Sequence, residues 1–493
     1  MSFHDLDEDV LAQILLLCDI YTVLSFFRVN KSFRCLALSK QLWRSLVFDL
    51  SSRHFIPHLD AIQDCTTAQL LAAAKWLVCG PETWTAQAHA PPTVSFSRTF
   101  PPGGEARLLP GGRHLAVLRS RNLYCQDVLT GRDIFIRALE PLHTMSWEME
   151  MLDDGHTAIF LFLHSPIGMA PELSILRVDL TMGHSDQLFH LELNQNGGLY
   201  NSPIISGDFL ALRLKANENQ RMIVVINWRE LKYVQFNDSN FSEITFANDR
   251  LVFLPGHIIL VTAASKPPNE QLLVVYTLRS IASRWRPLEE LQHNAGLPPE
   301  ELLISPERIS PMIFQRLVHN SRVLRVSQGA RLHIGIMLHP NPIRRDAYKV
   351  VVYSSDTTPN TSRQGFNRVQ GEGRGRGQGT VLFTYAVHAS PRVGIRASTD
   401  YELSWTRTSA FAIAPEIIRF PLSYAGYAVI SSHIRGTSGA TRVVDPRPMG
   451  GFSTKQTMRE VVVISQPPVP ASLSSSGVLI VSKDDGIQIS CYA

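Results

Sequence analysis

The sequence has few cysteines and no large excess of charge of either sign. Its 493 residues include six cysteines, which form no CxxC pair and have no zinc-finger spacing to histidine. This usage excludes a disulfide-dense framework and is typical of a reducing compartment. With 47 Lys and Arg against 43 Asp and Glu, the formal net charge of +4 is too small to indicate a nucleic-acid partner.

Long hydrophobic runs are also absent. The apolar stretch from Leu11 to Ile20 is too short to span a bilayer, which takes about 20 such residues. Residues 1–9 are acidic and lack the basic start of a signal peptide. We therefore expect a soluble protein of the cytoplasm or nucleus, without a membrane partner.

Motifs for catalysis are missing as well. There is no phosphate-binding loop, no HExxH, and no GxSxG; Gly436 to Gly439 comes near the last but lacks a glycine in register. The 17 histidines include no closely spaced pair suited to a metal. The sequence predicts no catalytic residue, no metal and no cofactor, and hence a protein that is not an enzyme. A propeller hydrolase with groups gathered at a central channel stays open as a distant alternative.

The first fifty residues, in contrast, are rich in apolar side chains. From Leu6 to Phe48, 26 of 43 residues are apolar, and their spacing predicts three short helices followed by a segment around Trp43. Asp19 and Asn30 are expected to cap the second and third helices. So small a module cannot bury this many large side chains by itself. The surplus apolar surface is covered either by the rest of the chain or by a partner protein.

Three segments of this region resemble the F-box, the adaptor-binding motif of SCF ubiquitin ligases. They are Leu6-Asp7-Glu8-Asp9-Val10 through Ile14, then Val29 to Arg34, and then Leu42-Trp43. The family usually has Pro where this chain has Asp7. Since proline there only pre-sets the start of a helix, an acidic first turn is an acceptable substitute.

The resemblance implies that residues 1–50 dock a Skp adaptor, which in turn holds cullin. Large apolar side chains at the centre of such an interface contribute most of its affinity. The side chains that we expect to contact the adaptor are Leu6, Val10, Ile14, Leu24, Val29 and Trp43. The pattern does not divide those that face the adaptor from those that form the core of the module.

Residues 51–100 are predicted to form a helical connector. A run rich in Ala and Leu from Ala68 to Val78 favours a helix, and Cys79-Gly80-Pro81 ends it. Trp76 and Trp84 are expected to pin this connector to the domain that follows. The connector would set the distance between the adaptor and a bound target.

From residue 101 the pattern changes to short strands separated by turns. Turn markers at Gly111, Gly155, Gly207 and Asn248 are 44, 52 and 41 residues apart. Each is followed by two predicted strands, which are Leu115–Leu118 and Leu123–Val128, Ala158–Phe162 and Leu173–Leu180, Phe209–Leu214 and Met222–Trp228, and Leu251–Leu254 and Leu272–Leu278. Weaker pairs are predicted at Leu332–Leu338 with Tyr348–Tyr353, and at Gly477–Val481 with Gly486–Cys491.

A turn and strand unit that recurs every ~40–50 residues is typical of a propeller blade. The repeats resemble WD repeats in a degenerate form, as in many F-box proteins of mushroom-type fungi. In place of the Trp-Asp pair stand Gln126-Asp127, Val178-Asp179 and Asn227-Trp228. We expect about six or seven blades, interrupted by loops near 284–312 and 355–380. The second loop holds an Arg-Gly tract, which favours a surface loop over an RNA contact.

The sequence thus predicts a multidomain protein, with a small all-α module and helical connector before an all-β propeller-like domain at 101–493. The leading interpretation is a non-catalytic substrate receptor of an SCF-type ubiquitin ligase, which binds a Skp adaptor and an unknown protein target. The alternative is a propeller interaction scaffold whose helices pack on its own sheets, without a ligase connection.

Overall fold

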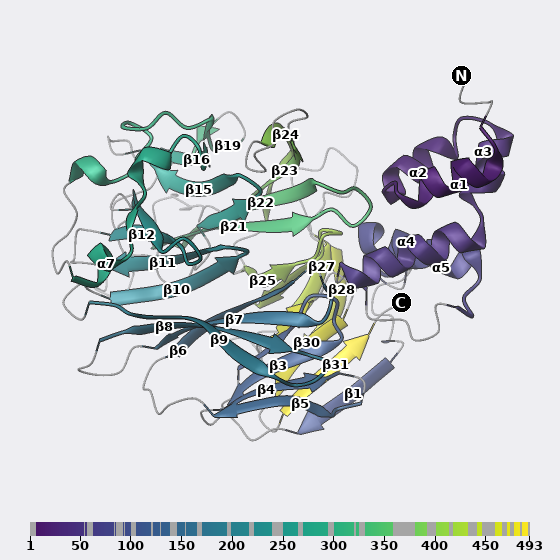
Figure 1. Ribbon diagram of the computed structural model, residues 1–493, viewed down its shortest axis with the longest axis horizontal. Helices are drawn as coiled ribbons and strands as arrows, with labels where there is room; N and C mark the ends of the chain where they lie inside the picture. Colours follow the sequence, from purple (N-terminus) through teal and green to yellow (C-terminus); the bar gives the residue numbers. More distant parts are fainter. Residues whose placement is uncertain are drawn as a thin grey trace, which may run out of the picture.

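The computed structural model places five helices beside a large body of antiparallel sheets (Figure 1). The residues that it describes are 6–53, 55–56, 63–82, 84, 92, 94–99, 105–119, 122–128, 130–138, 145–152, 154–164, 170–194, 199–215, 221–238, 250–264, 270–293, 300–319, 322–324, 331–357, 380–391, 401–413, 418–431, 441–445, 459–465, 471–473, 478–483 and 486–491.

The helical module, residues 8–79, consists of α1 (Glu8–Leu16), α2 (Ile20–Phe26), α3 (Lys31–Ala37), α4 (Lys40–Ser52) and α5 (Thr67–Cys79). The two predicted caps are confirmed. Asp19 Oδ1 accepts the Thr22 N–H at 2.8 Å, and Asn30 Oδ1 accepts the Phe33 N–H at 2.8 Å. Such caps satisfy N–H groups that have no partner within the helix. Short polar residues at these points therefore divide the apolar leader into separate helices.

The module has its own hydrophobic core, and Trp43 of α4 is its largest member. The indole is 1% exposed, and its Nε1–H donates to the Ala37 carbonyl at 2.7 Å. Leu15, Val23 and Leu77 belong to the same core, so α1, α2, α4 and α5 share it. Burying an aromatic side chain of this size contributes a large part of the stability of so small a unit.

The end of α5 is fixed against the sheets. Gly80 follows the helix with φ +84°, and a Cβ there would lie 2.2 Å from the Tyr427 ring. Trp84 is buried and packs edge-on against the same ring at 4.9 Å. The predicted role in pinning the connector is thereby confirmed for Trp84, whereas Trp76 is half-buried and its role stays a prediction.

Within the described residues, the strands form seven sheets of four or five strands and one two-stranded ribbon, β19 (Val318–His319) with β20 (Arg322–Val323). Four sheets contain only consecutive strands. They are β2 (Glu105–Leu108), β3 (His114–Arg119), β4 (Asn122–Asp127) and β5 (Asp133–Ala138); β6 (Met145–Met151), β7 (Thr157–His164), β8 (Glu172–Asp179) and β9 (Ser185–Glu192); β21 (Arg331–Pro340), β22 (Ala347–Thr357), β23 (Thr380–Pro391) and β24 (Tyr401–Ile413); and β25 (Ile418–Leu422), β26 (Ala428–Ser431), β27 (Thr441–Asp445) and β28 (Arg459–Ser465).

Three further sheets take a strand from elsewhere in the chain. They are β10 (Leu199–Ser206), β11 (Phe209–Lys215), β12 (Arg221–Asn227) and β13 (Lys232–Asn237) with β17 (Arg286–Pro287); β14 (Leu251–Leu254), β15 (His257–Ala263) and β16 (Gln271–Thr277) with β18 (Ile313–Arg316); and β29 (Ala471–Leu473), β30 (Val478–Lys483) and β31 (Gly486–Cys491) with β1 (Val94–Thr99).

Neighbouring sheets meet through their first strands. β6 lies beside β10, β14 beside β21, and β25 beside β29, and β29 also lies beside β2 of the first sheet. This is a propeller-like arrangement, in which sheets cover the apolar faces of one another. The buried clusters lie between sheets, as in the large cluster that joins the β6–β9 and β10–β13 sheets.

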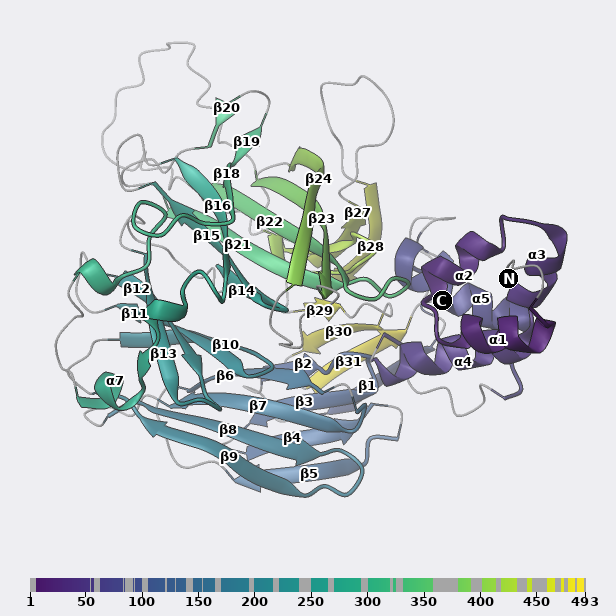
Figure 2. The same ribbon diagram turned by 45° about the horizontal axis from the view of Figure 1, so that its top comes forward.

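The first strand of the sheet region belongs to its last sheet. β1 pairs antiparallel with β31 from Val94 opposite Cys491 to Thr99 opposite Gly486, and the two lie together in both views (Figures 1 and 2). The sheet region therefore begins at Val94, earlier than the predicted residue 101. Periodicity could not reveal this strand, because its partner lies almost 400 residues away.

The eight strands predicted from the first four turn markers are all strands, and so are both later pairs. The strands predicted after the fourth turn marker, Asn248, were assigned to the wrong positions in their sheet. Leu251–Leu254 is the first strand of its sheet and not the second, and the turn equivalent to Gly207 is at Gly256, which has φ +70°. The missed strand, β15, has all seven of its side chains buried and therefore shows no alternation. The sheet β25–β28 was missed entirely, because no strand was predicted between Tyr353 and Gly477.

The positions of the degenerate Trp-Asp pairs have a common structural role. Asp127, Asp179 and Asn227 each end the third strand of a sheet and accept backbone N–H groups of the following turn, at Thr130, Met182 and Glu230. Asx turns of this kind replace backbone pairing at a tight reversal. The turn thus needs the Asp or Asn side chain as a hydrogen-bond acceptor. It does not need a tryptophan beside that residue.

The predicted loop at 284–312 instead contains short helices among its described residues, which are η3 (Ala282–Arg284), α7 (Glu289–His293) and η4 (Glu300–Leu302). It leaves the β14–β16 sheet, adds β17 to the neighbouring sheet and buries Leu288, Leu291 and Leu303 before returning as β18. The insert therefore clamps two sheets together. The Arg-Gly tract at 371–377 lies outside the described residues.

A buried ion cluster joins the same two sheets. Asp238, after β13, accepts hydrogen bonds from Arg250 Nη1 at 2.6 Å and from Arg213 Nε at 3.0 Å. Asp238 and Arg250 are each about 1% exposed at the side chain. Burial lowers the pKa of Arg250 to about 10, against the attraction of Asp238, so the guanidinium stays charged at neutral pH.

We expect Asp238→Asn to destabilise the protein by about 3–5 kcal/mol, because it leaves a buried cation without its counter-charge. Chemical denaturation measures this. The matched control is Asp186→Asn, which removes the exposed ion pair with Arg177 and should cost less than about 1 kcal/mol. Equal effects of the two variants would contradict the assignment.

Candidate interaction site

Helix α1 carries two neighbouring rows of apolar side chains, and only one of them is buried. Leu11 and Leu15 are 7% and 1% exposed and face the core. Val10 and Leu17 are 44% and 81% exposed, although their spacing of two helical turns is as regular. The row at spacings of three and four residues, Leu6, Val10, Ile14 and Leu17, is therefore the outer one.

The helical module is unusually rich in exposed apolar side chains. Among the described residues, eleven large hydrophobic side chains are exposed, and six of them lie in this module, at Val10, Leu17, Tyr21, Leu24, Val29 and Phe48. The other five are spread over the much longer sheet region. Such a concentration on one small unit is typical of a surface that binds another protein.

The structure divides the six predicted contact residues into three groups. Val10, Leu24 and Val29 are exposed, whereas Leu6 and Ile14 are half-buried. Trp43 must be reassigned from the contact set to the core, because its side chain is enclosed and its indole N–H is already bonded. Periodicity cannot make this division, since both faces of the helices are apolar.

Three exposed residues were missed by sequence reasoning. Leu17 follows α1, Tyr21 begins α2, and Phe48 lies on α4 opposite the core. Leu17 continues the Val10 and Ile14 row, so the helical spacing alone could have identified it. Phe48 gave no such signal, because its neighbours Leu46 and Val47 are both buried.

The module is joined to the sheets by the loop 341–346, between β21 and β22. Ile343 packs against the core of the module, and its carbonyl accepts the Tyr21 N–H at 2.8 Å. Arg53, after α4, donates to the carbonyls of Asn341 at 3.1 Å and Pro342 at 3.4 Å. One loop thus contacts the start of α2 and the end of α4.

Charged groups complete this joint. Asp19 Oδ2 accepts the Arg345 N–H at 3.2 Å, while its other oxygen caps α2. The Arg345 guanidinium pairs with Asp49 at 3.0 Å, and Arg344 lies over the Tyr21 ring at 5.1 Å. Of the exposed apolar residues, only Tyr21 takes part in this joint, which leaves Val10, Leu17, Leu24 and Val29 uncovered.

A cavity of ≈ 690 Å³ lies between α4 and the turns of the first two sheets. Phe48 and Ile56 line its helical side, and Asp127 and Asp154 lie on the turn side. Burial alone would raise the pKa of each carboxyl, but hydrogen bonds from Thr130 and Arg113 to Asp127, and from Thr157 and His156 to Asp154, lower both. These carboxylates hold the turns and are not poised for proton transfer.

Within the part of the chain that the structure describes, no group of three or more His, Cys, Asp or Glu side chains is arranged to hold a metal ion. Cys18, Cys35, Cys65, Cys79 and Cys125 are free thiols. None of the described helices combines the length and the apolar character needed to cross a membrane.

Comparison with known proteins gives no family. No family model matches the sequence, and no curated protein matches it. Among solved structures, the WD40 domain of SCAP from fission yeast is 7% identical over 79% of this chain and 84% of its own, with a TM-score of 0.36. A chain of the yeast Nup82-Nup159-Nup116 nucleoporin complex is 9% identical over 79% and 97%, with a TM-score of 0.41. Likenesses this weak say nothing about function, and the sheets of this chain themselves define its propeller-like fold.

We expect Ile343→Asp to loosen the helical module, because an unpaired carboxylate against an apolar core costs several kcal/mol. Amide hydrogen exchange in α2 and α4 should become at least about tenfold faster, with the β6–β9 sheet unchanged. Met312→Asp, at an exposed apolar position of the sheet region, is the control. Unchanged exchange in α2 would show that the joint does not hold the module.

The folded state as a whole is also expected to lose stability in acid. His339 precedes the loop, its Nε2 is buried, and burial together with Lys349, opposite it across the sheet, lowers its pKa from 6.5 to about 4. Between these values the unfolded chain binds a proton that the folded chain does not, so stability falls as the pH drops from about 6.5 towards 4. In urea titrations His339→Gln should flatten this slope, whereas His190→Gln, at an exposed position, should leave it unchanged.

Proposed function

We propose that this protein is a two-part interaction scaffold, whose helical module docks one protein partner while its propeller-like sheets hold another. One observation carries the proposal. The module keeps four apolar side chains exposed away from the cavity beside α4, at Val10, Leu17, Leu24 and Val29, although its core is complete and its attachment to the sheets uses other residues. Exposed apolar surface that neither folding nor domain attachment uses is best explained by a second molecule.

The partner that we propose for the module is a Skp adaptor, and through it cullin, so that the protein would serve as a non-catalytic substrate receptor of an SCF-type ubiquitin ligase. Support comes from the resemblance of residues 6–43 to the F-box, together with the exposure of Val10, Leu24 and Val29 within it. Ubiquitin transfer would then be the work of other subunits. The seven sheets, with β1 completing the last of them, would form a closed propeller that binds the target.

The alternative is an interaction scaffold without a ligase connection. The joint through loop 341–346 favours it, because part of the helical surface does pack on the protein's own sheets, at Tyr21, Asp19 and Arg53. The two candidates differ in what binds the remaining apolar side chains.

Binding of purified Skp adaptor to the full chain tests the ligase proposal. We expect Leu17→Asp with Val29→Asp to weaken binding by at least about 30-fold, the effect of losing roughly 2 kcal/mol at an interface centre. Both residues are well exposed, at 81% and 64%, so the fold should persist. Met182→Asp, a 69% exposed apolar position on the sheets, should bind as wild type.

Three outcomes of this experiment are informative. If the wild-type chain does not bind the adaptor, the ligase role is lost. If it captures another protein through Leu17 and Val29, the simpler scaffold remains. If binding is equal in all variants, the proposed surface on the helical module is refuted.

A further inference from the structure

The sheet β21–β24 has one apolar face and one polar face. Val381, Phe383, Tyr385, Val387 and Ala389 of β23 pack into a large buried cluster with the β14–β18 sheet. The alternate residues of the same strand, from Thr384 to His388, are half-buried or exposed. In a propeller-like fold both faces of a sheet normally pack on the neighbouring sheets. A polar face on the β21–β24 sheet therefore requires an explanation.

Register places three rows of side chains on that polar face. His388 lies opposite Ala347 and Ser404, and Ala386 lies opposite Lys349 and Thr406, while Thr384 begins the third row. Directly opposed residues on adjacent strands have Cβ atoms about 5 Å apart. Lysine, histidine and hydroxyl groups from three strands are therefore gathered in one area.

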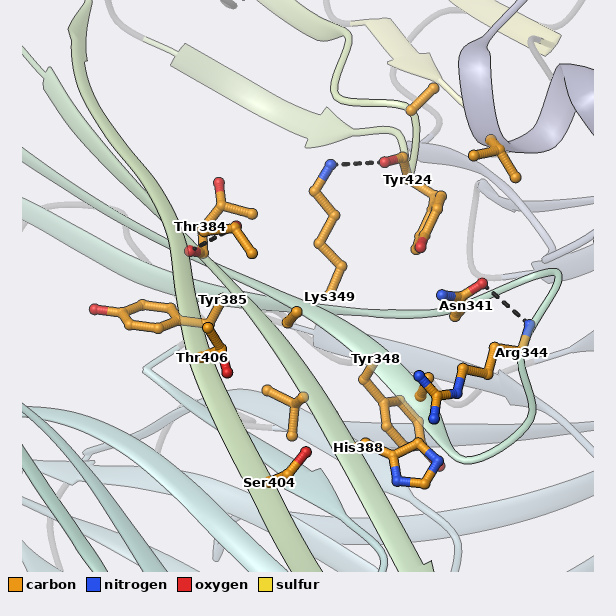
Figure 3. A pocket seen from close by; sticks show the side chains of 16 residues that line it. Asn341, Arg344, Tyr348, Lys349, Thr384, Tyr385, His388, Ser404, Thr406 and Tyr424 are labelled. Carbon is orange, nitrogen blue, oxygen red and sulfur yellow. Dashed lines mark hydrogen bonds between the residues drawn. The ribbon is translucent and has the colours of Figure 1, made fainter. Parts of the chain in front are cut away.

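A cavity of ≈ 550 Å³ lies above this face. Tyr424 and Ala425, after β25, line its far side, Val78 of α5 reaches its rim, and Asn341 and Arg344 come from the joint loop. Figure 3 shows the Lys349 side chain reaching towards Tyr424, and a dashed line marks the hydrogen bond between them. The volume falls within the range of small-molecule sites, about 300–1,000 Å³.

The lining is basic and rich in hydroxyl groups. Its nitrogen-bearing side chains include those of Arg344, Lys349 and His388, and among the described lining residues there is no carboxylate. Lys349 Nζ donates to the Tyr424 carbonyl at 2.8 Å, which holds the ammonium in the cavity. The hydroxyl groups on the same wall are those of Thr384, Ser404, Thr406 and Thr408.

Stability alone does not account for this composition. Small hydroxyl side chains leave the space unfilled, and the cationic side chains of Arg344 and Lys349 border it. Both features suit an anion. The His388 ring is oriented by Ser390, whose Oγ lies 3.0 Å from Nδ1, and burial raises the pKa of Tyr424, so that its phenol stays a neutral donor.

We propose that this cavity binds a small phosphate monoester that carries a planar ring, of the size of a nucleoside monophosphate. The phosphate would lie between Lys349 and Arg344, the two side-chain types that bind phosphate most strongly, and would accept from the hydroxyls of Ser404 and Thr406. The Tyr424 ring, whose centroid lies 5.5 Å from Lys349 Nζ, borders the remaining space and suits a planar ring. This site is independent of the helical surface that binds a partner in the proposed function.

Isothermal titration of the full chain with AMP, GMP, CMP and UMP tests the proposal, with adenosine as the neutral control. At least one nucleotide should bind, adenosine should not, and binding should weaken as salt is added. Lys349→Met should weaken binding at least about tenfold. Lys232→Met, on the exposed face of another sheet, is the matched control and should leave binding unchanged.

Because Lys349 also holds the Tyr424 loop, a second variant is needed. Ser404→Ala with Thr406→Val removes two hydroxyls from exposed positions and should weaken nucleotide binding several-fold with the circular dichroism spectrum unchanged. No binding of any nucleotide at millimolar concentration, or binding that neither variant alters, would overturn the proposal. Tighter binding of a phosphoserine peptide than of all four nucleotides would also overturn it, by assigning the phosphate to a protein.

Discussion

The contact between Ile343 and the core of the helical module determines how the two parts of this protein relate. A single apolar side chain, carried on a loop between two long strands, enters a core that the helices otherwise complete. The surrounding hydrogen bonds and ion pairs come from Arg53, Asp19 and Asp49. These contacts do not involve Val10, Leu17 or Val29, whose side chains stay exposed.

This arrangement explains why the leader contains more apolar residues than its core can hold. Leu11 and Leu15 stabilise the module, and the adjacent row of Val10 and Leu17 does not. A second apolar row on a helix costs solubility and adds nothing to a core that is already full. Its presence is consistent with selection for binding, which the proposed adaptor would provide.

In the sheet region, some turns and strands could be predicted from the sequence and others could not. Turns at Gly111, Gly155 and Gly207 were predicted correctly because a positive φ selects glycine locally. The strand β15 was missed because it is buried on both faces and has no alternation. Neither β1 nor the β17 addition could be predicted, since both depend on pairing with distant segments. The polar cavity also escaped notice, because its wall is assembled from β22, β23, β24 and the joint loop.

The sequence by itself determined the local features: the capped helices at Asp19 and Asn30, the Asx turns at Asp127 and Asp179, and the abundance of apolar side chains before residue 50. Each depends on interactions within a few residues. Only the tertiary structure decided that Trp43 is core and Leu17 surface, that Ile343 joins the two parts, and that Lys349 and His388 share a cavity. These outcomes depend on which of several apolar or polar faces packs against a segment far away in the sequence. The spacing of residues along the chain does not specify that contact.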